Sequence, residues 1–152
     1  MIFFRKASGI DQAILCEAFK QIGRDPVDCE RYFTLRKQGE CDILFAENKE
    51  KKLVGHAILL WKSRFKLHNA DHTPEMMDVY IYPSFRRLGI ATALLHHSEQ
   101  LVKQMGLLKL GLGVMSGVEY SYTHSLYLKS GYHQIGTDIL PEGEVVVYEK
   151  GL

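Results

Sequence analysis

Residues 81–92 read Ile81-Tyr82-Pro83-Ser84-Phe85-Arg86-Arg87-Leu88-Gly89-Ile90-Ala91-Thr92. The stretch begins with the last residues of an apolar strand. Pro83 ends that strand, because proline has no N–H to donate to a sheet. A basic turn that contains Gly89 then opens directly into a long amphipathic helix. The first turn of a helix carries unpaired N–H groups and about half a positive charge, so it attracts phosphate groups. The stretch therefore predicts a strand, an anion-binding turn and a helix in succession.

Two arginines and one glycine favour an anion-binding function for this turn. Arg86 and Arg87 add positive charge, and Gly89 has no side chain to keep a pyrophosphate from the backbone. An ordinary turn with solvated arginines is the alternative. The patterns G-x-x-x-x-G-K-[ST] and G-x-G-x-x-G are absent from the sequence, which excludes a P-loop and a Rossmann turn.

Outward from this turn, strands and helices alternate along the chain. Apolar periodicity predicts strands over 2–5, 43–47, 53–61, 76–82, 108–114, 132–136 and 145–149. It predicts helices from a cap at Asp11 to a stop at Gly23, and over 28–37, 87–105 and 119–130. The order β-α-α-β-β-β-α-β-α-β-β describes an α/β fold, a mixed sheet with helices on both faces.

The segment 62–74 is polar and basic with few apolar residues, which indicates a solvated loop, the frayed ends of two strands, or a wall of an acceptor site. In the strand that follows the long helix, one face carries Gly111 and Gly113. Glycines there fit either close approach of a ligand to the backbone or the packing of a helix.

Two motifs give the chain a family resemblance. Arg86-x-x-Gly89-x-Ala91 resembles the R/Q-x-x-G-x-G/A signature of the GNAT N-acetyltransferase superfamily, and 126–132, LYLKSGY, is similar to its L-Y-x-K-x-G-[FY] motif. The order of elements agrees over nearly the whole chain. One departure is Arg87, which stands where a common variant of the signature has glycine.

The resemblance implies a single domain over 1–152 with the GNAT fold, a mixed, mostly antiparallel central sheet flanked by helices. It implies acetyl-CoA as a cosubstrate, with no metal, and direct attack by a primary amine of a small molecule or peptide. The pantetheine arm of acetyl-CoA would pair with the backbone of Val79, Tyr80 and Ile81. The remaining cofactor-binding residues that it implies are Arg86, Arg87, Leu88, Gly89, Ile90, Ala91 and Thr92.

Acetyl transfer needs a neutral amine and a protonated leaving thiol. An amine of ordinary pKa, about 10.4, must lose a proton to a base or to water. The resemblance makes Glu75 the candidate base, and Asp78 or a water relay are the alternatives for this role. Glu75 itself could instead be a structural partner of the basic loop. The resemblance makes Tyr127 the acid that protonates the thiolate; the alternative is a core tyrosine.

Composition limits the remaining possibilities. The 152 residues carry 19 Lys and Arg against 18 Asp and Glu, so no overall field favours nucleic acid or an anionic membrane. Three cysteines form no disulfide framework or zinc motif, and we expect free thiols in a cytoplasmic protein. Dimers are common in the family, so a homodimer is one expectation. The rival functions are a non-catalytic acyl-CoA-binding regulatory module and an unrelated nucleotide-binding protein.

Overall fold

The computed structural model describes residues 1–68 and 71–152, in two compact units. The amino-terminal unit comprises Met1–Leu60 and Asp78–Leu94, and the carboxy-terminal unit comprises Trp61–Met77 and Leu95–Leu152. The chain passes between the units within strand β4 (Glu75–Ile81) and within helix α3 (Ile90–Gln104).

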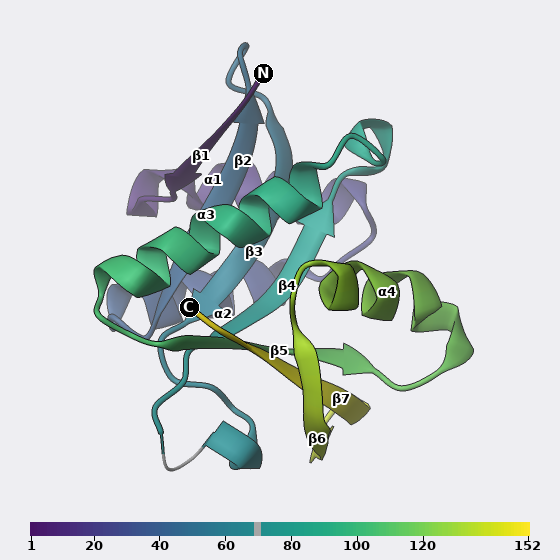
Figure 1. Ribbon diagram of the computed structural model, residues 1–152. Coiled ribbons are helices and arrows are strands. Elements are labelled where there is room, and N and C mark those ends of the chain that lie inside the picture. Colours follow the sequence, from purple (N-terminus) through teal and green to yellow (C-terminus); the bar gives the residue numbers. More distant parts are fainter. Residues whose placement is uncertain (69–70) are drawn as a thin grey trace. The chain divides into compact units, whose positions relative to one another are not determined.

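The elements follow the predicted order (Figure 1). The other strands are β1 (Ile2–Lys6), β2 (Cys41–Asn48), β3 (Leu53–Leu60), β5 (Lys109–Met115), β6 (His133–Leu140) and β7 (Gly143–Gly151). The other α-helices are α1 (Gln12–Gln21), α2 (Pro26–Lys37) and α4 (Ser121–Lys129). Short 3-10 helices are η1 (Gly9–Asp11), η2 (Lys66–His68), η3 (Pro83–Phe85) and η4 (Val118–Tyr120). Hydrogen bonds order the strands β1-β2-β3-β4-β5-β7-β6, with β4 and β5 parallel and the pairs β1–β2, β2–β3, β5–β7 and β6–β7 antiparallel. The mixed, mostly antiparallel sheet that the sequence predicts is confirmed.

In the amino-terminal unit, helices cover both faces of the strands. Figure 1 shows α1 and α2 behind β1, β2 and β3, and the beginning of α3 in front of the sheet. Helix α1 buries Leu15 and Phe19, and α2 buries Tyr32 and Phe33. These side chains and the fully buried Phe45 of β2 form part of the core of this unit.

Helices α2, α3 and α4 begin at Pro26, Ile90 and Ser121 rather than at residues 28, 87 and 119, and the predicted cap of α1 also differs in detail. Helix α2 begins two residues early, at Pro26, because the carboxylate of Asp25 accepts the N–H of Val27 at 3.0 Å and proline suits the first helical position. Asp11 directly precedes α1, but its side chain does not cap that helix. Its carboxylate pairs instead with Arg5 at 2.8 Å and accepts the N–H of Ser8 at 2.7 Å, and a charged partner binds a carboxylate more strongly than a neutral one does.

In the carboxy-terminal unit, the basic segment that follows β3 is anchored rather than solvated. Phe65 and His68 are buried, and Phe65 packs in an apolar cluster with Val145 and Val147 of β7. The ring nitrogens of His68 lie 3.3 Å from the hydroxyl oxygen of Ser63 and 3.2 Å from a carboxylate oxygen of Glu149. The expectation of a solvated loop is therefore wrong for this part of 62–74; residues 69 and 70 lie outside the described residues.

These two rings explain the glycines of β5. A Cβ on Gly111 would lie 2.4 Å from the His68 ring, and one on Gly113 would lie 2.6 Å from the Phe65 ring. Both approaches are closer than real Cβ contacts. In this structure the glycine face of β5 accommodates two buried rings of the preceding segment.

We therefore expect Gly111→Ala to destabilise the protein, because the added methyl group meets a ring that Ser63 and Glu149 hold in place. The expected loss is about 1–3 kcal/mol of unfolding free energy, as for overpacking in a core. Chemical denaturation measures it, with Gly9→Ala as the matched control, because a Cβ on Gly9 meets nothing within 4 Å. Adding His68→Ala to Gly111→Ala should cost less than the two changes separately. Equal stability of the Gly111 and Gly9 variants would contradict this account.

Candidate active site

The predicted anion-binding turn lies in the amino-terminal unit, between β4 and α3. After β4 the chain makes the short helix η3, and α3 then begins at Ile90. The N–H of Ala93 donates to the carbonyl of Gly89 at 3.1 Å, which is the first hydrogen bond of the helix. The N–H groups of 90–92 precede that bond, so they have no partner within the helix and can bind an anion.

The backbone of the turn is left-handed at two positions, Arg87 (φ 67°) and Gly89 (φ 77°). Glycine adopts this conformation at little cost, and no heavy atom lies within 4 Å of the position that a Cβ of Gly89 would take. The backbone there is open to close approach. The left-handed conformation of Arg87 favours glycine, which is the residue that a common variant of the signature has at this position. An arginine there strains the backbone.

Arg86 has a second function besides its charge. Its Nε donates to the carbonyl of Ile81 at 2.7 Å, and its guanidinium lies 5.1 Å from the centre of the Tyr80 ring. These contacts fix the turn to the end of β4, which the sequence alone did not indicate.

A polar cluster lies beside this strand in the same unit. Asp78 of β4 is left-handed, with φ 50°. Its carboxylate accepts a hydrogen bond from Arg24 at 2.8 Å and from the hydroxyl of Tyr32 at 3.0 Å. Burial by itself would raise the pKa of Asp78, but His56 and Arg24 outweigh that effect and hold the pKa well below its usual value. Asp78 is therefore ionised at neutral pH.

His56 of β3 completes the cluster. Its side chain is fully buried, its Nδ1 lies 3.0 Å from the hydroxyl oxygen of Tyr82, and its ring stacks on Tyr80 with 5.8 Å between ring centres. Its Nε2 lies 3.5 Å from Oδ2 of Asp78. Burial, together with the charge of Asp78, raises the pKa of Tyr82, so the phenol keeps its proton.

The candidate base Glu75 lies in the carboxy-terminal unit and is almost fully buried. Its carboxylate pairs with the guanidinium of Arg64 at 2.7 Å and accepts the backbone N–H of Arg64 at 3.0 Å. A second guanidinium nitrogen of Arg64 contacts Glu142 at 3.1 Å. These are the contacts expected of a structural partner of the basic segment.

The candidate acid Tyr127 also lies in the carboxy-terminal unit, on α4. It is buried and packs edge-to-face on Tyr132, with 6.2 Å between ring centres. Burial raises the pKa of Tyr127 to about 12. Its hydroxyl is therefore protonated at neutral pH, as a proton donor must be.

The structure thus brings the predicted donor-binding residues together in one unit and adds three residues that the sequence did not single out. Residues 79–81 and 86–92 share the amino-terminal unit with Arg24, Tyr32 and His56. His56 did leave a signal, because it is the one polar side chain within the otherwise apolar strand LVGHAILL. Nothing in the sequence relates Arg24 or Tyr32 to Asp78.

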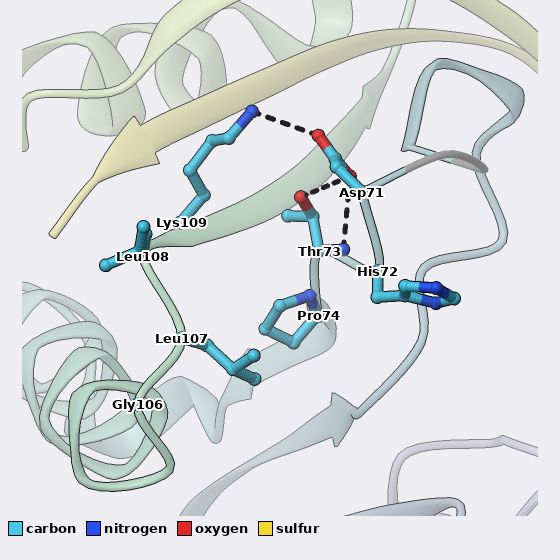
Figure 2. Close-up of a pocket in the computed structure, with 8 residues that line it drawn as sticks. All are labelled: Asp71, His72, Thr73, Pro74, Gly106, Leu107, Leu108 and Lys109. Carbon is cyan, nitrogen blue, oxygen red and sulfur yellow. Dashed lines mark hydrogen bonds and ion pairs between the residues drawn. The ribbon is translucent and has the colours of Figure 1, made fainter.

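A pocket of about 310 Å³ lies elsewhere, in the carboxy-terminal unit (Figure 2). Asp71 there pairs with Lys109 at 3.0 Å and accepts the hydroxyl of Thr73 at 2.6 Å, so its charge is already satisfied (Figure 2). The other walls are largely apolar, with Pro74, Leu107 and Leu108. None of the residues expected to bind the donor or to catalyse lines this pocket.

Two absences can be stated for residues 1–68 and 71–152, one of a metal-binding cluster and one of a membrane-spanning helix. No group of three or more His, Cys, Asp or Glu side chains in these ranges is arranged to hold a metal ion. Among the same residues, no helix combines the length and the apolar character needed to cross a membrane.

Comparison with known proteins gives the family. No curated protein matches the sequence. Solved structures do match the fold. One is a ribosomal-protein-alanine N-acetyltransferase from Brucella melitensis, with 19% identity, TM-score 0.75 and 99% of each chain covered. Another is PaiA N-acetyltransferase from Thermoplasma acidophilum in complex with coenzyme A, with 20% identity, TM-score 0.74 and 100% of this chain and 99% of that chain covered.

A third is yncA from Salmonella typhimurium with its cofactor acetyl-CoA, with 16% identity, TM-score 0.74 and coverage of 100% of this chain and 94% of that one. At these identities the likeness shows the fold. The model of the acetyltransferase (GNAT) family matches residues 10–132, most of the chain. The chain therefore belongs to the GNAT acetyltransferase family.

Proposed function

We propose that this protein transfers the acetyl group of acetyl-CoA to a primary amine by direct attack, without a covalent enzyme intermediate. The observation that carries the proposal is the turn 86–92, where a left-handed glycine and the N–H groups of a helix start follow β4 and the short helix η3. The pyrophosphate of CoA would bind these N–H groups, with charge from Arg86 and Arg87.

The pantetheine arm would extend along the backbone of Val79, Tyr80 and Ile81, which leads into the turn. Two fold relatives support this donor, because one was solved with coenzyme A and another with acetyl-CoA. The acceptor would be a small molecule or a peptide with a primary amine. The free cysteines suit the reducing cytoplasm, and a homodimer and a single domain over 1–152 stay predictions.

An ammonium loses two protons on its way to an amide, one before it attacks and one from the tetrahedral intermediate, and the thiolate of CoA gains one. Tyr127 is the proposed donor of the proton that the thiolate gains, and the proton that the intermediate loses would restore its hydroxyl. Burial keeps this hydroxyl protonated at neutral pH and makes it a weaker acid than a free tyrosine. Glu75 is the candidate for accepting the first amine proton. Its carboxylate is held by the guanidinium and the backbone N–H of Arg64, which is the arrangement of a structural partner and leaves fewer oxygen lone pairs for an amine.

A first experiment tests donor binding. Gly89→Glu should abolish CoA binding in calorimetry, because it places bulk and negative charge where the pyrophosphate would lie. Arg87→Gly is the matched variant: it removes one charge at a position that already has a positive φ, so binding should weaken yet persist. If folded Gly89→Glu binds CoA as tightly as the parent, the donor site lies elsewhere.

A second experiment tests the acid. Tyr127→Phe keeps the ring and its packing on Tyr132 but removes the proton, so we expect turnover to fall by roughly 10²–10⁴ with CoA affinity unchanged. Thiol release from acetyl-CoA with a panel of small amines, amino acids and short peptides measures turnover, and calorimetry measures affinity. Unchanged turnover would show that Tyr127 is a core residue. A parent that binds acetyl-CoA and acetylates nothing in the panel would favour a regulatory acyl-CoA-binding module.

A third experiment tests Glu75. Glu75→Gln keeps the shape of the side chain but breaks the buried ion pair with Arg64, so we expect the free energy of unfolding to fall by roughly 1–3 kcal/mol. Turnover of the folded variant, measured well below its melting temperature, should stay within a few-fold of the parent. A loss of roughly 10²-fold or more in turnover, without a loss of stability, would identify Glu75 as the base instead.

A further inference from the structure

The imidazole of His56 is buried in the amino-terminal unit and has no part in the proposed function as described above. Its side chain is 0% exposed. Among residues 1–68 and 71–152, its Nε2 is the only buried side-chain nitrogen or oxygen without a hydrogen bond. A fully buried polar atom in this state costs free energy, so its retention needs a reason.

The neighbours of His56 define where its proton lies. Asp78 is ionised and can only accept, so the Nε2 that faces it at 3.5 Å carries the hydrogen. A neutral imidazole has one N–H, so Nδ1 is then an acceptor. The hydroxyl of Tyr82, 3.0 Å away, donates to it. The three side chains lie in the order hydroxyl, imidazole and carboxylate that is found in hydrolase triads, and the 3.5 Å from Nε2 to Asp78 is a contact without a hydrogen bond.

The chain also lies beside the proposed path of the donor. Asp78 directly precedes 79–81 on β4, and Tyr82 directly follows them. Both keep part of their surface exposed, with 14% for the Asp78 side chain, whereas His56 is covered. Each of these two neighbours therefore connects the buried imidazole to the surface of the unit.

We propose that Tyr82, His56 and Asp78 form a proton relay that deprotonates the acceptor amine. The amine nitrogen gives a proton to the Tyr82 oxygen, while the hydroxyl proton of Tyr82 passes to Nδ1 of His56. The imidazolium that forms is stabilised by Asp78 through Nε2–H. The relay resets when the proton returns through Tyr82 to water, so no proton is gained or lost overall. This inference rests on the proposed acetyl transfer.

The relay accounts for features that Asp78 alone does not. A carboxylate already bound by Arg24 and Tyr32 is a poor base, whereas imidazole is the side chain whose ordinary pKa lies nearest neutrality. The titratable and charged groups that face His56 are Asp78 and Tyr80 of β4 and Tyr82 directly after it, with Arg24 after α1 and Tyr32 of α2 bound to Asp78.

The first arm of the test needs no acceptor. Imidazole ¹⁵N spectra of the full chain should show His56 as the Nε2–H tautomer with a hydrogen-bonded Nδ1. Tyr82→Phe should move the Nδ1 resonance toward that of a free ring nitrogen, while Tyr32→Phe, which removes a hydroxyl from the same carboxylate outside the relay, should leave Nδ1 in place. An Nδ1–H tautomer would overturn the proposal, whether or not acetyl transfer is demonstrated.

The second arm uses the best acceptor from the amine panel, with saturating acetyl-CoA. We expect Tyr82→Phe and His56→Gln each to lower kcat/KM at neutral pH by at least roughly 10²-fold. The loss should shrink at high pH, where the amine is already neutral. The double variant should lose little more than either single one, because the groups act in series.

Stability and donor binding separate the relay from a structural role. CoA affinity of the variants should stay within a few-fold of the parent, and CoA binding lost only in the variants would show a structural role and overturn the relay. Failure of the parent to bind CoA would count against the proposed function instead. A loss of kcat/KM that is the same at every pH, or losses that multiply in the double variant, would show that the cluster is only structural and would overturn the relay.

Discussion

The carboxylate of Asp78 holds the polar interior of the amino-terminal unit together. It binds Arg24 from the end of α1 and Tyr32 from α2, and it faces His56 of β3, so one side chain connects both helices to two strands. A buried charge without partners would cost several kcal/mol. The positions of α1 and α2 relative to β4 therefore depend on the hydrogen-bond partners that the Asp78 carboxylate needs.

Backbone strain accompanies this arrangement. Asp78, Arg87 and Gly89 all have positive φ, and two of the three are residues for which that conformation is unfavourable. Strained residues persist where their surroundings determine them, and they gather at binding and catalytic sites. Here they mark the strand and the turn along which the proposed donor would lie.

In the carboxy-terminal unit, too, buried polar groups have charged or hydrogen-bonding partners. Glu75 is buried against Arg64, and His68 is held between Ser63 and Glu149. Of the basic residues in this segment, Arg64 neutralises the buried carboxylate of Glu75 and His68 places its ring against the glycine face of β5, whereas the side chains of Lys62, Lys66 and His72 are exposed. A segment with few apolar residues is in this way built into the core.

Much of the fold was determined by the sequence alone. Apolar periodicity, with Pro83 and Gly89 as local signals, gave the order of all strands and helices and the turn before α3, because such signals act between neighbours in the chain. The signature around Arg86 gave the family for the same reason. Only the tertiary structure decided that Asp78 meets Arg24 and His56, and that Phe65 and His68 cover Gly113 and Gly111. Those contacts join residues far apart in the chain, and burial and charge compensation select them only once the elements have packed.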